Sequence, residues 1–488
     1  ILPLGTKQTK YNAGLWKSNP FLFKDSAPSF TRFCWTNSAL RNLLFAIMEY
    51  QADTIFGRNT SAKGMKFYIE TYGCQMNVSD SELVSSILIG AGWEIASSID
   101  TANLILFNTC SVRKHAEDRV LGRISNELHR KSQNPELKIA VIGCMAQRMG
   151  QRLLENDIGV DFVVGVDQYQ ELPALLSQDS GVETEFNYQQ IYPGLRPLHG
   201  DKTCAFVTIM RGCDNFCSYC IVPRVRGRER SVDFQQIVSE VRECGNKGLK
   251  DVTLLGQNVN SYSWGDFDFP RLLKDLNKIE SIYRLHFITS HPKDLSDSLI
   301  ETMAGSDKVC EHLHLPLQSG NNSVLKAMNR KYTIEEYLKL VDKLRTSIPG
   351  IALTTDLIAG FPGESEADFA DTLDVMSEVH FDYAFCFKYS EREGTSACSL
   401  PGQIPETERL KRLQKMIELQ RKITLAKFSA QVGKTVEVYV ESISKKSDKM
   451  VSGKTRDYKI AVLSGSVNDI GKLKTAKVIK ATPGTLIC

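Results

Sequence analysis

The sequence predicts an α/β protein of three successive domains: a doubly wound α/β domain, a partial (β/α)6 barrel and a small β-barrel. Two observations lead to this prediction. From Met65 to about residue 430, short apolar runs typical of buried parallel strands alternate with segments of helical length. After residue 430 the alternation stops, and strand-like segments follow one another without an intervening helix.

The first domain is predicted to span residues 65–178. Its strands are expected at 66–71, 103–107 and 138–142, and its helices at 79–91, 114–132 and 147–155. The strands are largely apolar, as expected for parallel strands that helices cover on both faces. A dinucleotide site is the natural alternative for such a domain, but no Gly-x-Gly-x-x-Gly follows any of these strands.

The central domain is predicted to span residues 201–430, after a linker at 179–200 that carries turn residues. Its strands are expected near 205–210, 251–255, 284–289, 310–315, 351–358 and 382–388. Helices are expected near 233–248, 267–279, 295–304, 333–347 and 365–379. Six β/α units form an incomplete barrel, and the active site of a barrel lies at the carboxyl ends of its strands.

The third domain is predicted to span residues 431–488, after a helix at 405–430 that is rich in Lys and Arg. Its strands are expected at 436–440, 458–462 and 473–480. The domain carries 11 basic and 5 acidic residues. A small basic β-barrel suits the phosphate backbone of a nucleic acid.

The composition of the whole chain is that of an ordinary globular protein. It has 488 residues, of which 42% are hydrophobic and 24% are charged, and its formal net charge is +3. Thirteen cysteines over this length do not resemble a secreted disulfide scaffold, and no apolar run is long enough to cross a membrane. We therefore expect a cytoplasmic protein that acts as a monomer.

Residues 1–64 differ in composition from the rest of the chain. They contain eight basic and three acidic residues and show no clear periodicity. We expect a poorly ordered extension or a targeting segment here. If the segment is a transit peptide, the protein belongs in an organelle, either the mitochondrion or the plastid.

Three cysteines follow the first predicted strand of the barrel: Cys213, Cys217 and Cys220 stand at Cys-x3-Cys-x2-Cys spacing. A structural zinc site closes its shell with four protein ligands. Three thiolates on a four-iron cluster leave one iron open, so this spacing indicates a reactive iron–sulfur cofactor. A zinc site with a distant fourth ligand and a group of buried thiols are the alternatives.

Three more cysteines, Cys74, Cys110 and Cys144, each follow a predicted strand of the first domain. Loops after the carboxyl ends of parallel strands converge on one crevice. A glycine precedes Cys74 and Cys144, which lets the backbone approach a ligand closely. We therefore expect a second site of three thiolates with an open iron. The other cysteines lack cluster spacing and are interpreted as structural or free: Cys34, Cys204, Cys244, Cys310, Cys386, Cys398 and Cys488.

Polar residues also follow the predicted barrel strands. The candidates for ligand contacts at the mouth of the barrel are Gln257, Asn258, Ser290, His291, His314, Gln318 and Asp356. Any one of them could instead cap a helix or bond a loop. His286 and His312 fall one pleat further inward, so we expect them in the core.

The motif Arg-Gly-Cys-Asp-Asn-Phe-Cys-Ser-Tyr-Cys, placed after a strand, resembles that of the radical S-adenosylmethionine (SAM) enzymes. The resemblance implies that Cys213, Cys217 and Cys220 hold a 4Fe-4S cluster whose open iron binds SAM, and that an electron from the cluster cleaves SAM to a 5'-deoxyadenosyl radical. Tyr219 is then expected beside the adenine. Other parts of SAM would contact four residues at the strand ends, namely Gln257, Ser290, His314 and Asp356.

Over residues 65–488 the chain resembles the radical SAM methylthiotransferases of the MiaB type. The stretches Leu-Leu-Gly-Gln-Asn-Val-Asn-Ser-Tyr and His-Leu-His-Leu-Pro-Leu-Gln-Ser-Gly carry the resemblance to this branch. It implies that Cys74, Cys110 and Cys144 hold an auxiliary 4Fe-4S cluster, and that the third domain is a TRAM-like RNA-binding barrel. Arg224 stands where the family commonly has Tyr.

The resemblance also implies a reaction. Sulfur and a methyl group would be inserted at carbon 2 of N6-isopentenyl-adenosine, next to the anticodon in tRNA. One SAM would methylate a sulfur at the auxiliary cluster, and the radical from a second SAM would activate carbon 2. The base is expected to flip out of the anticodon loop to reach this site. An electron donor and a sulfur source are also required, and no motif identifies them.

Two kinds of alternative remain. Related methylthiotransferases act on threonylcarbamoyl-adenosine in tRNA or on a ribosomal protein. The alternative from another class is a non-enzymatic iron–sulfur or zinc protein that binds RNA and uses the barrel as a scaffold.

Overall fold

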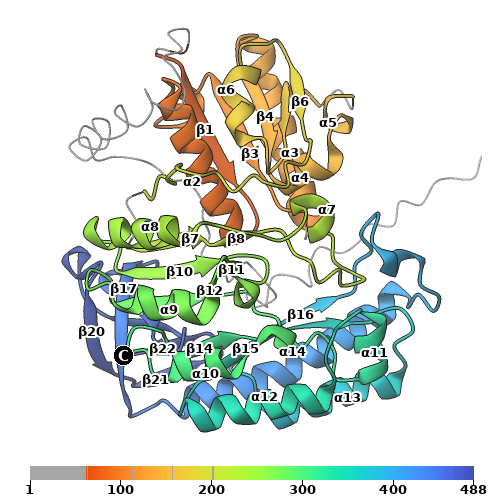
Figure 1. Cartoon of the computed structure of the whole chain (residues 1–488), viewed down its shortest axis with the longest axis vertical. Coiled ribbons are helices and arrows are strands. Elements are labelled where there is room, and N and C mark those ends of the chain that lie inside the picture. Colours follow the sequence, from red (N-terminus) through yellow and green to blue (C-terminus); the bar gives the residue numbers. More distant parts are fainter. Residues whose placement is uncertain (1–61, 63, 112–113, 156–157, 201–202) are drawn as a thin grey trace, which may run out of the picture.

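The computed structural model describes residues 62, 64–111, 114–155, 158–200 and 203–488. All but two residues of the extension predicted at 1–64 therefore lie outside the described part. Figure 1 shows the first domain above the central barrel and the third domain beside one end of the barrel. Within the described part, no helix is long and apolar enough to cross a membrane.

The first domain is a parallel sheet with helices on both faces, as predicted. The strand order is β2-β1-β3-β4-β5-β6. Along β3, Leu104 and Leu106 pack into one apolar cluster, whereas Ile105 and Phe107 pack into another on the opposite face. The strands are β1 (Lys66–Thr71), β2 (Glu94–Ile95), β3 (Leu104–Asn108), β4 (Lys138–Ile142), β5 (Phe162–Val164) and β6 (Gly181–Glu183).

The helices of this domain follow the predicted pattern with one difference. They are α2 (Gln75–Gly90), α3 (Lys114–Gln133), α4 (Cys144–Met149), α5 (Arg152–Glu155) and α6 (Leu172–Leu175). The helix expected at 147–155 is divided into α4 and α5 because Gly150 adopts a φ of +51° between them. Strand β6 lies inside the segment predicted as a linker, where its three residues pair with β5.

The six predicted strands of the barrel are all present. They are β7 (Cys204–Thr208), β10 (Asp251–Leu255), β13 (Arg284–Phe287), β14 (His312–His314), β15 (Ala352–Ala359) and β16 (Tyr383–Lys388). They form two parallel groups, β13-β10-β7 and β14-β15-β16, linked by a bridge between Leu285 and Val309. One apolar core includes side chains from both groups.

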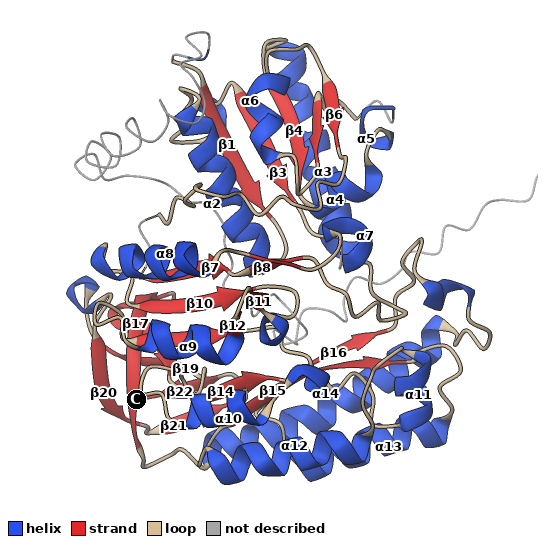
Figure 2. Cartoon of the chain, in the orientation of Figure 1, coloured by secondary structure: helices blue, strands red, loops and turns tan. Residues whose placement is uncertain are grey.

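Helices pack on the outside of these strands, as Figure 2 shows. They are α8 (Phe234–Asn246), α9 (Phe269–Asn277), α10 (Asp297–Ala304), α11 (Asn322–Ala327), α12 (Ile334–Ser347) and α13 (Glu366–Val379). Thr333 and Ser365 form capping boxes that fix the starts of α12 and α13. A short hairpin of β8 (Met210–Arg211) and β9 (Arg230–Ser231) flanks the cysteine loop and the helix α7 (Val222–Arg226).

The third domain is a curled six-stranded sheet that follows the long helix α14 (Glu406–Ser429). Its strands are β17 (Thr435–Ser444), β18 (Ser447–Thr455), β19 (Ile460–Ser464), β20 (Leu473–Lys477), β21 (Lys480–Thr482) and β22 (Thr485–Ile487). Strand β18 was not predicted, because its sequence is mostly polar and lacks an apolar alternation. Its apolar residue Val451 nevertheless packs in the core of the sheet.

The third domain covers the amino ends of the barrel strands. Arg284, at the start of β13, is fully buried and donates to the carbonyl of Lys454 at 2.6 Å and to the Glu437 carboxylate at 2.8 Å. Arg456 forms an ion pair of 2.7 Å with Glu311. The turn between β18 and β19 therefore closes the end of the barrel opposite the expected active site.

Two histidines inside the barrel contact this turn. His286 and His312 are buried, as predicted, and the ring of Tyr458 stacks on His312 with a centroid distance of 4.7 Å. His286 meets the same ring edge-on at 5.2 Å. Tyr458 thus continues the core of the barrel into the third domain.

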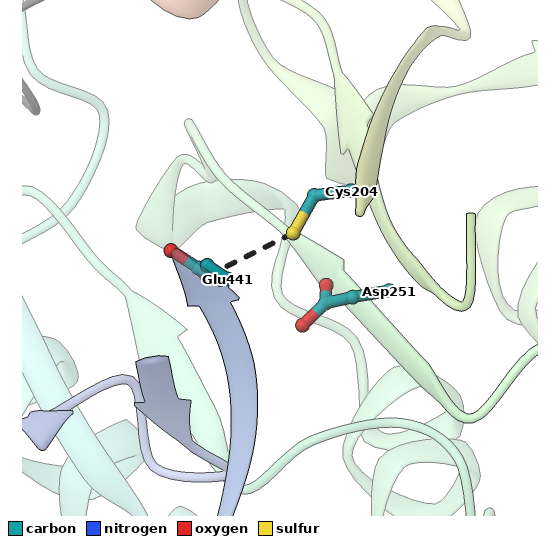
Figure 3. Close-up of side chains that lie close together, drawn as sticks. All are labelled: Cys204, Asp251 and Glu441. Carbon is teal, nitrogen blue, oxygen red and sulfur yellow. Dashed lines mark hydrogen bonds between the residues drawn. The ribbon is translucent and has the colours of Figure 1, made fainter. Parts of the chain in front are cut away.

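A thiol and two carboxylates meet in the interface between the barrel and the third domain, as Figure 3 shows. The ligand atoms of Cys204, Asp251 and Glu441 lie within 4.8 Å of one another, a set that could suit a metal ion. However, the ammonium group of Lys454 lies 3.0 Å from Glu441. Burial opposes the charge of Lys454, but Tyr458 and Glu441 raise its pKa well above the usual value. This ammonium group already supplies the positive charge, so we interpret the cluster as an interdomain contact.

Arg284→Ala is expected to destabilise the protein by about 1–3 kcal/mol, because it leaves the carbonyls of Lys454 and Glu437 without their buried donor. The midpoint of thermal denaturation measures the effect. Arg271→Ala, which removes an exposed pair with Asp275, is the control. Equal midpoints for the two variants would contradict the role of Arg284.

Candidate functional site

The three cysteines of the first domain come together at the carboxyl ends of β1, β3 and β4. Hydrogen bonds join the Cys110 thiol to those of Cys74 and Cys144. Cys110 and Cys144 are buried, whereas Cys74 is an exposed residue whose thiol donates to Asn77 Oδ1 at 3.3 Å. The structure therefore brings these three thiols together.

Two glycines make this approach possible. A side chain at Gly73 would place its Cβ 2.5 Å from the Cβ of Cys110, and one at Gly143 would place it 2.4 Å from Asn108 Oδ1. Both glycines also have positive φ angles, of +120° and +88°. The loops can therefore converge only because these two positions lack a side chain.

The charges around these thiols favour thiolates at two of the three positions. The hydrogen bond from Cys110 lowers the pKa of Cys74 to about 6 and also lowers the pKa of Cys144. The nearby guanidinium of Arg226 acts in the same direction on both. The pKa of Cys110 itself is raised, mainly by its bond with Cys144. Thiolates are the form that binds iron, so the donor set fits an iron–sulfur cluster.

The second set of cysteines lies on the loop after β8. Asn215 Nδ2 lies 3.4 Å from the sulfur of Cys213, and Arg330 Nη1 lies 3.5 Å from that of Cys217. Both groups donate to sulfur, as second-sphere hydrogen bonds do in cluster sites. Arg330 is buried and also bonds the carbonyl of Pro316, which fixes its position.

Burial raises the pKa of Cys213 and raises that of Cys220 to about 12. These thiols are therefore protonated at neutral pH unless a bound cation replaces the protons. Cys213 is buried and Cys217 and Cys220 are half-buried, and three sulfurs within one loop fit the ligands of a metal cluster.

The residues predicted at the mouth of the barrel have different environments. Gln257 Oε1 accepts from the backbone N–H of Gly212, so this side chain fastens the start of the cysteine loop. His314 Nε2 lies 3.5 Å from Asp356 Oδ2. Tyr219 packs against an apolar cluster that contains Val324 and Met328.

Among the residues predicted at the mouth of the barrel, three carry a buried polar atom with no hydrogen-bond partner within the described residues. They are Asn258 Oδ1, three residues after β10, and Ser290 Oγ and His291 Nε2, three and four residues after β13. His291 Nδ1 accepts from the Lys293 N–H, and burial lowers the pKa of the ring to about 2. The neutral ring therefore carries its proton on Nε2, as an unsatisfied donor. Such groups fit a polar cofactor in the mouth of the barrel.

Backbone strain is concentrated in the same region. Phe216, Thr289, Gln318 and Asn329 are non-glycine residues with positive φ angles between 47° and 71°. Each lies on a loop at the carboxyl side of the barrel, where such conformations often accompany function.

A buried group of ions, which the sequence analysis did not identify, connects the two cysteine sites. Asp80 of α2 forms ion pairs with Arg211 of β8 at 2.9 Å and with Arg226 of α7 at 2.7 Å. Burial opposes the ionisation of Asp80, but the two arginines outweigh it and lower its pKa. Arg211 lies two residues before Cys213, and Arg226 acts electrostatically on Cys74 and Cys144.

A loop after β16 also contacts both the first domain and the cysteine loop of the barrel. Glu393 lies 3.4 Å from Arg152 and 3.9 Å from Arg148 of the first domain. Ala397 donates its backbone N–H to the carbonyl of Ser218 in the cysteine loop. Arg224, the departure from the family pattern, is exposed and lies beside Gly394 of this loop.

Three family descriptions match successive parts of the chain. Residues 66–165 match the uncharacterized protein family UPF0004, residues 207–376 match the radical SAM superfamily, and residues 429–487 match the TRAM domain. These ranges correspond to the sheet of the first domain, the barrel and the curled third domain.

Curated relatives match nearly the whole described chain. A tRNA-2-methylthio-N(6)-dimethylallyladenosine synthase from Thermoanaerobacter sp. (strain X514) is 46% identical over 434 residues, which cover 87% of this chain and 92% of the relative. The enzyme of the same name from Clostridium novyi (strain NT) is 44% identical over 89% of this chain and 98% of its own length. The chain belongs to this family. It is thus a radical SAM enzyme, a class that uses SAM and a 4Fe-4S cluster.

A solved structure supports the fold of the family. The radical SAM methyltransferase TsrM from Kitasatospora setae superposes with a TM-score of 0.52, over 67% of this chain and 75% of its own. The sequences are 12% identical, so the likeness concerns the fold alone.

Asp80→Asn is expected to destabilise the protein by about 3–5 kcal/mol at neutral pH, because it leaves two buried guanidinium groups without a counter-ion. Thermal denaturation measures the loss, and hydrogen exchange should increase in both α2 and β8. Asp100→Asn, at an exposed position of the same domain, is the control. An unchanged midpoint with unchanged exchange would show that the ion group does not join the domains.

Proposed function

We propose that this enzyme inserts a methylthio group at carbon 2 of N6-isopentenyl-adenosine beside the anticodon of tRNA. The names of the curated relatives support the substrate. The observation that carries the proposal is the presence of two separate groups of three thiols, one in each of two domains. Carbon 2 of an adenine is inert to acid–base chemistry, so its functionalisation needs both a radical source and a sulfur source.

We assign one cluster to each group. Cys213, Cys217 and Cys220 would hold the cluster that binds SAM, and the three thiols around Cys110 would hold an auxiliary cluster. When bound, these groups supply an electron, a radical and the sulfur. Three ligands on each side leave one iron open for SAM or for sulfur.

The side chains around the clusters have separate roles in this proposal. Arg330 and Asn215 donate to cluster sulfurs and so influence the reduction potential. Ser290 and His291 offer unpaired donors to the polar groups of SAM, and the His314–Asp356 pair lies further along the mouth. Gln257 acts indirectly, because it holds Gly212 at the start of the cysteine loop. Tyr219, packed in an apolar pocket, would contact the adenine.

The domain limits proposed from the sequence fit these roles with one adjustment. The first domain extends through β6 at residue 183, and the linker to the barrel then covers 184–200. The ion group of Asp80, Arg211 and Arg226 sits between the first domain and the barrel. It sets the position of the auxiliary thiols relative to the radical-forming loop.

The third domain would hold the tRNA through lysines that face away from the barrel. Lys454, Arg456 and Lys459 are used in ion pairs with acidic residues of the interface or the same turn. Exposed lysines for which the described residues provide no acidic partner are Lys434, Lys446, Lys449, Lys477 and Lys480. Lys434 and Lys477 lie at the same end of the sheet, because β17 and β20 pair there. Such lysines suit phosphate contacts.

Cys217→Ala is expected to abolish reductive cleavage of SAM, whereas Cys110→Ala should retain cleavage and lose sulfur insertion. The reason is that each substitution removes a ligand from only one group of thiols. Anaerobic assays with reconstituted protein, SAM, a reductant, sulfide and tRNA would measure 5'-deoxyadenosine and, by mass spectrometry, the modified nucleoside.

The matched control is Cys244→Ala, a buried cysteine of α8 outside both groups, which should leave both products unchanged. Equal cleavage by wild type and Cys217→Ala would overturn the assignment. A modified peptide instead of a nucleoside would favour the ribosomal-protein alternative. Binding of RNA without SAM cleavage by the wild type would favour the non-enzymatic one.

A further inference from the structure

Two aromatic rings stand exposed beside the radical-forming loop. Tyr188, in the linker, is 58% exposed, and Phe216, between Cys213 and Cys217, is 47% exposed. Large apolar side chains at such exposure are ordinary when scattered singly. These two instead both lie beside the segment Gly227–Arg228, and neither belongs to the proposed cluster ligands or the SAM contacts.

The segment Gly227–Arg228 lies beside both rings. The Arg228 guanidinium lies 5.3 Å from the centroid of the Phe216 ring, and the residue before it, Gly227, lies against Tyr188. Tyr188 stacks on Phe186 at 5.8 Å, and both rings lie over Gly227, where a Cβ would be 3.3 Å from Phe186 and 3.6 Å from Tyr188. The rings and the cation therefore form one surface, which we call the aromatic platform: Phe186, Tyr188, Phe216 and Arg228.

The platform is held in place although it is exposed. Asp214 fixes Arg228 through two bonds of 2.7 and 3.1 Å. Asn329 donates to the carbonyl of Phe216 at 2.8 Å and so holds that residue at its φ of +47°. Arg230, which is buried against Asp167, donates to the carbonyl of Asn187 at 2.7 Å and fixes the linker next to Tyr188. A preorganised exposed ring loses little conformational entropy when a flat ligand stacks on it.

The chemistry of the platform fits unpaired bases. A base offers a flat π face that stacks on aromatic rings, and a guanidinium can stack on a base or contact its phosphate. Two further cations lie near the platform. Lys331 is exposed and donates to Asn329, the residue that holds Phe216, and Arg224 is exposed four residues before Arg228.

We propose that Tyr188 and Phe216 are a base-stacking platform for the unpaired nucleotides that flank the modified adenosine. This inference rests on the proposed function, because it assumes that the substrate is an RNA loop. A base that leaves its stack to enter the barrel leaves its neighbours without a stacking partner. The rings beside the entrance replace that partner, and so they position the loop during the reaction.

The test uses an anticodon stem–loop RNA that contains N6-isopentenyl-adenosine with 2-aminopurine as the adjacent base. Stacking on an aromatic ring quenches 2-aminopurine fluorescence, so the readout reports the contact directly. Reconstituted wild type should quench the probe on binding. Tyr188→Leu and Phe216→Leu should each lose most of the quench and bind about tenfold more weakly. Tyr188→Phe and Phe216→Tyr, which keep a ring, should behave as wild type.

Tyr283→Leu is the matched control. Tyr283 is 43% exposed and lies 5.7 Å from the Lys250 ammonium, but it precedes β13 at the opposite end of the barrel. It should leave the quench and the Kd unchanged. The iron content of each Phe216 variant shows whether the cysteine loop still assembles its cluster, and the Tyr188 variants test the platform outside that loop.

Equal quenching and affinity for Tyr188→Leu and wild type would overturn the proposal. An equal loss in Tyr188→Phe would do so as well, because it would assign the effect to the hydroxyl. Wild type that binds and quenches the RNA but makes no modified nucleoside would support the platform and contradict the proposed function. Binding of a protein partner, without RNA binding, that depends on Tyr188 would contradict the platform.

Discussion

The buried ion group of Asp80, Arg211 and Arg226 is the interaction on which the functional arrangement depends. It is the point where α2, which begins after Cys74, meets the hairpin that leads into the loop of Cys213, Cys217 and Cys220. Buried charges are stable only when they are paired in good geometry, so the group specifies one relative position of the two domains. Arg226 also acts on Cys74 and Cys144, which couples the same contact to the electrostatics of the auxiliary thiols.

The two ends of the barrel have different roles. At the amino ends of the strands, the turn of the third domain fills the interior with Tyr458 and closes it with Arg284 and Arg456. At the carboxyl ends, buried donors such as Ser290 Oγ and several strained backbone positions are left for a cofactor. This division follows the general behaviour of β/α barrels, in which stability resides at one end and chemistry at the other. The same arrangement separates the lysines that contact the barrel from the exposed lysines of the third domain that are proposed to bind RNA.

Local chemistry explains what the sequence could predict. The spacing of Cys213, Cys217 and Cys220 lies within one loop, and the convergence of Cys74, Cys110 and Cys144 follows from the geometry of a parallel sheet. The ion group and the contacts of Arg284 could not be predicted, because they join segments more than a hundred residues apart and have no periodicity. Strand β18 was missed for a related reason: pairing on both edges stabilises it, while its own sequence is polar.

The central claim is that one chain holds two clusters, each with one iron free of protein ligands, and that only one of them binds SAM. Mössbauer spectroscopy of the reconstituted, 57Fe-enriched protein tests this most directly. We predict two 4Fe-4S clusters, and addition of SAM should change the signal of a single iron in one of them. A single cluster, or two clusters that both remain unchanged when SAM is added, would contradict it.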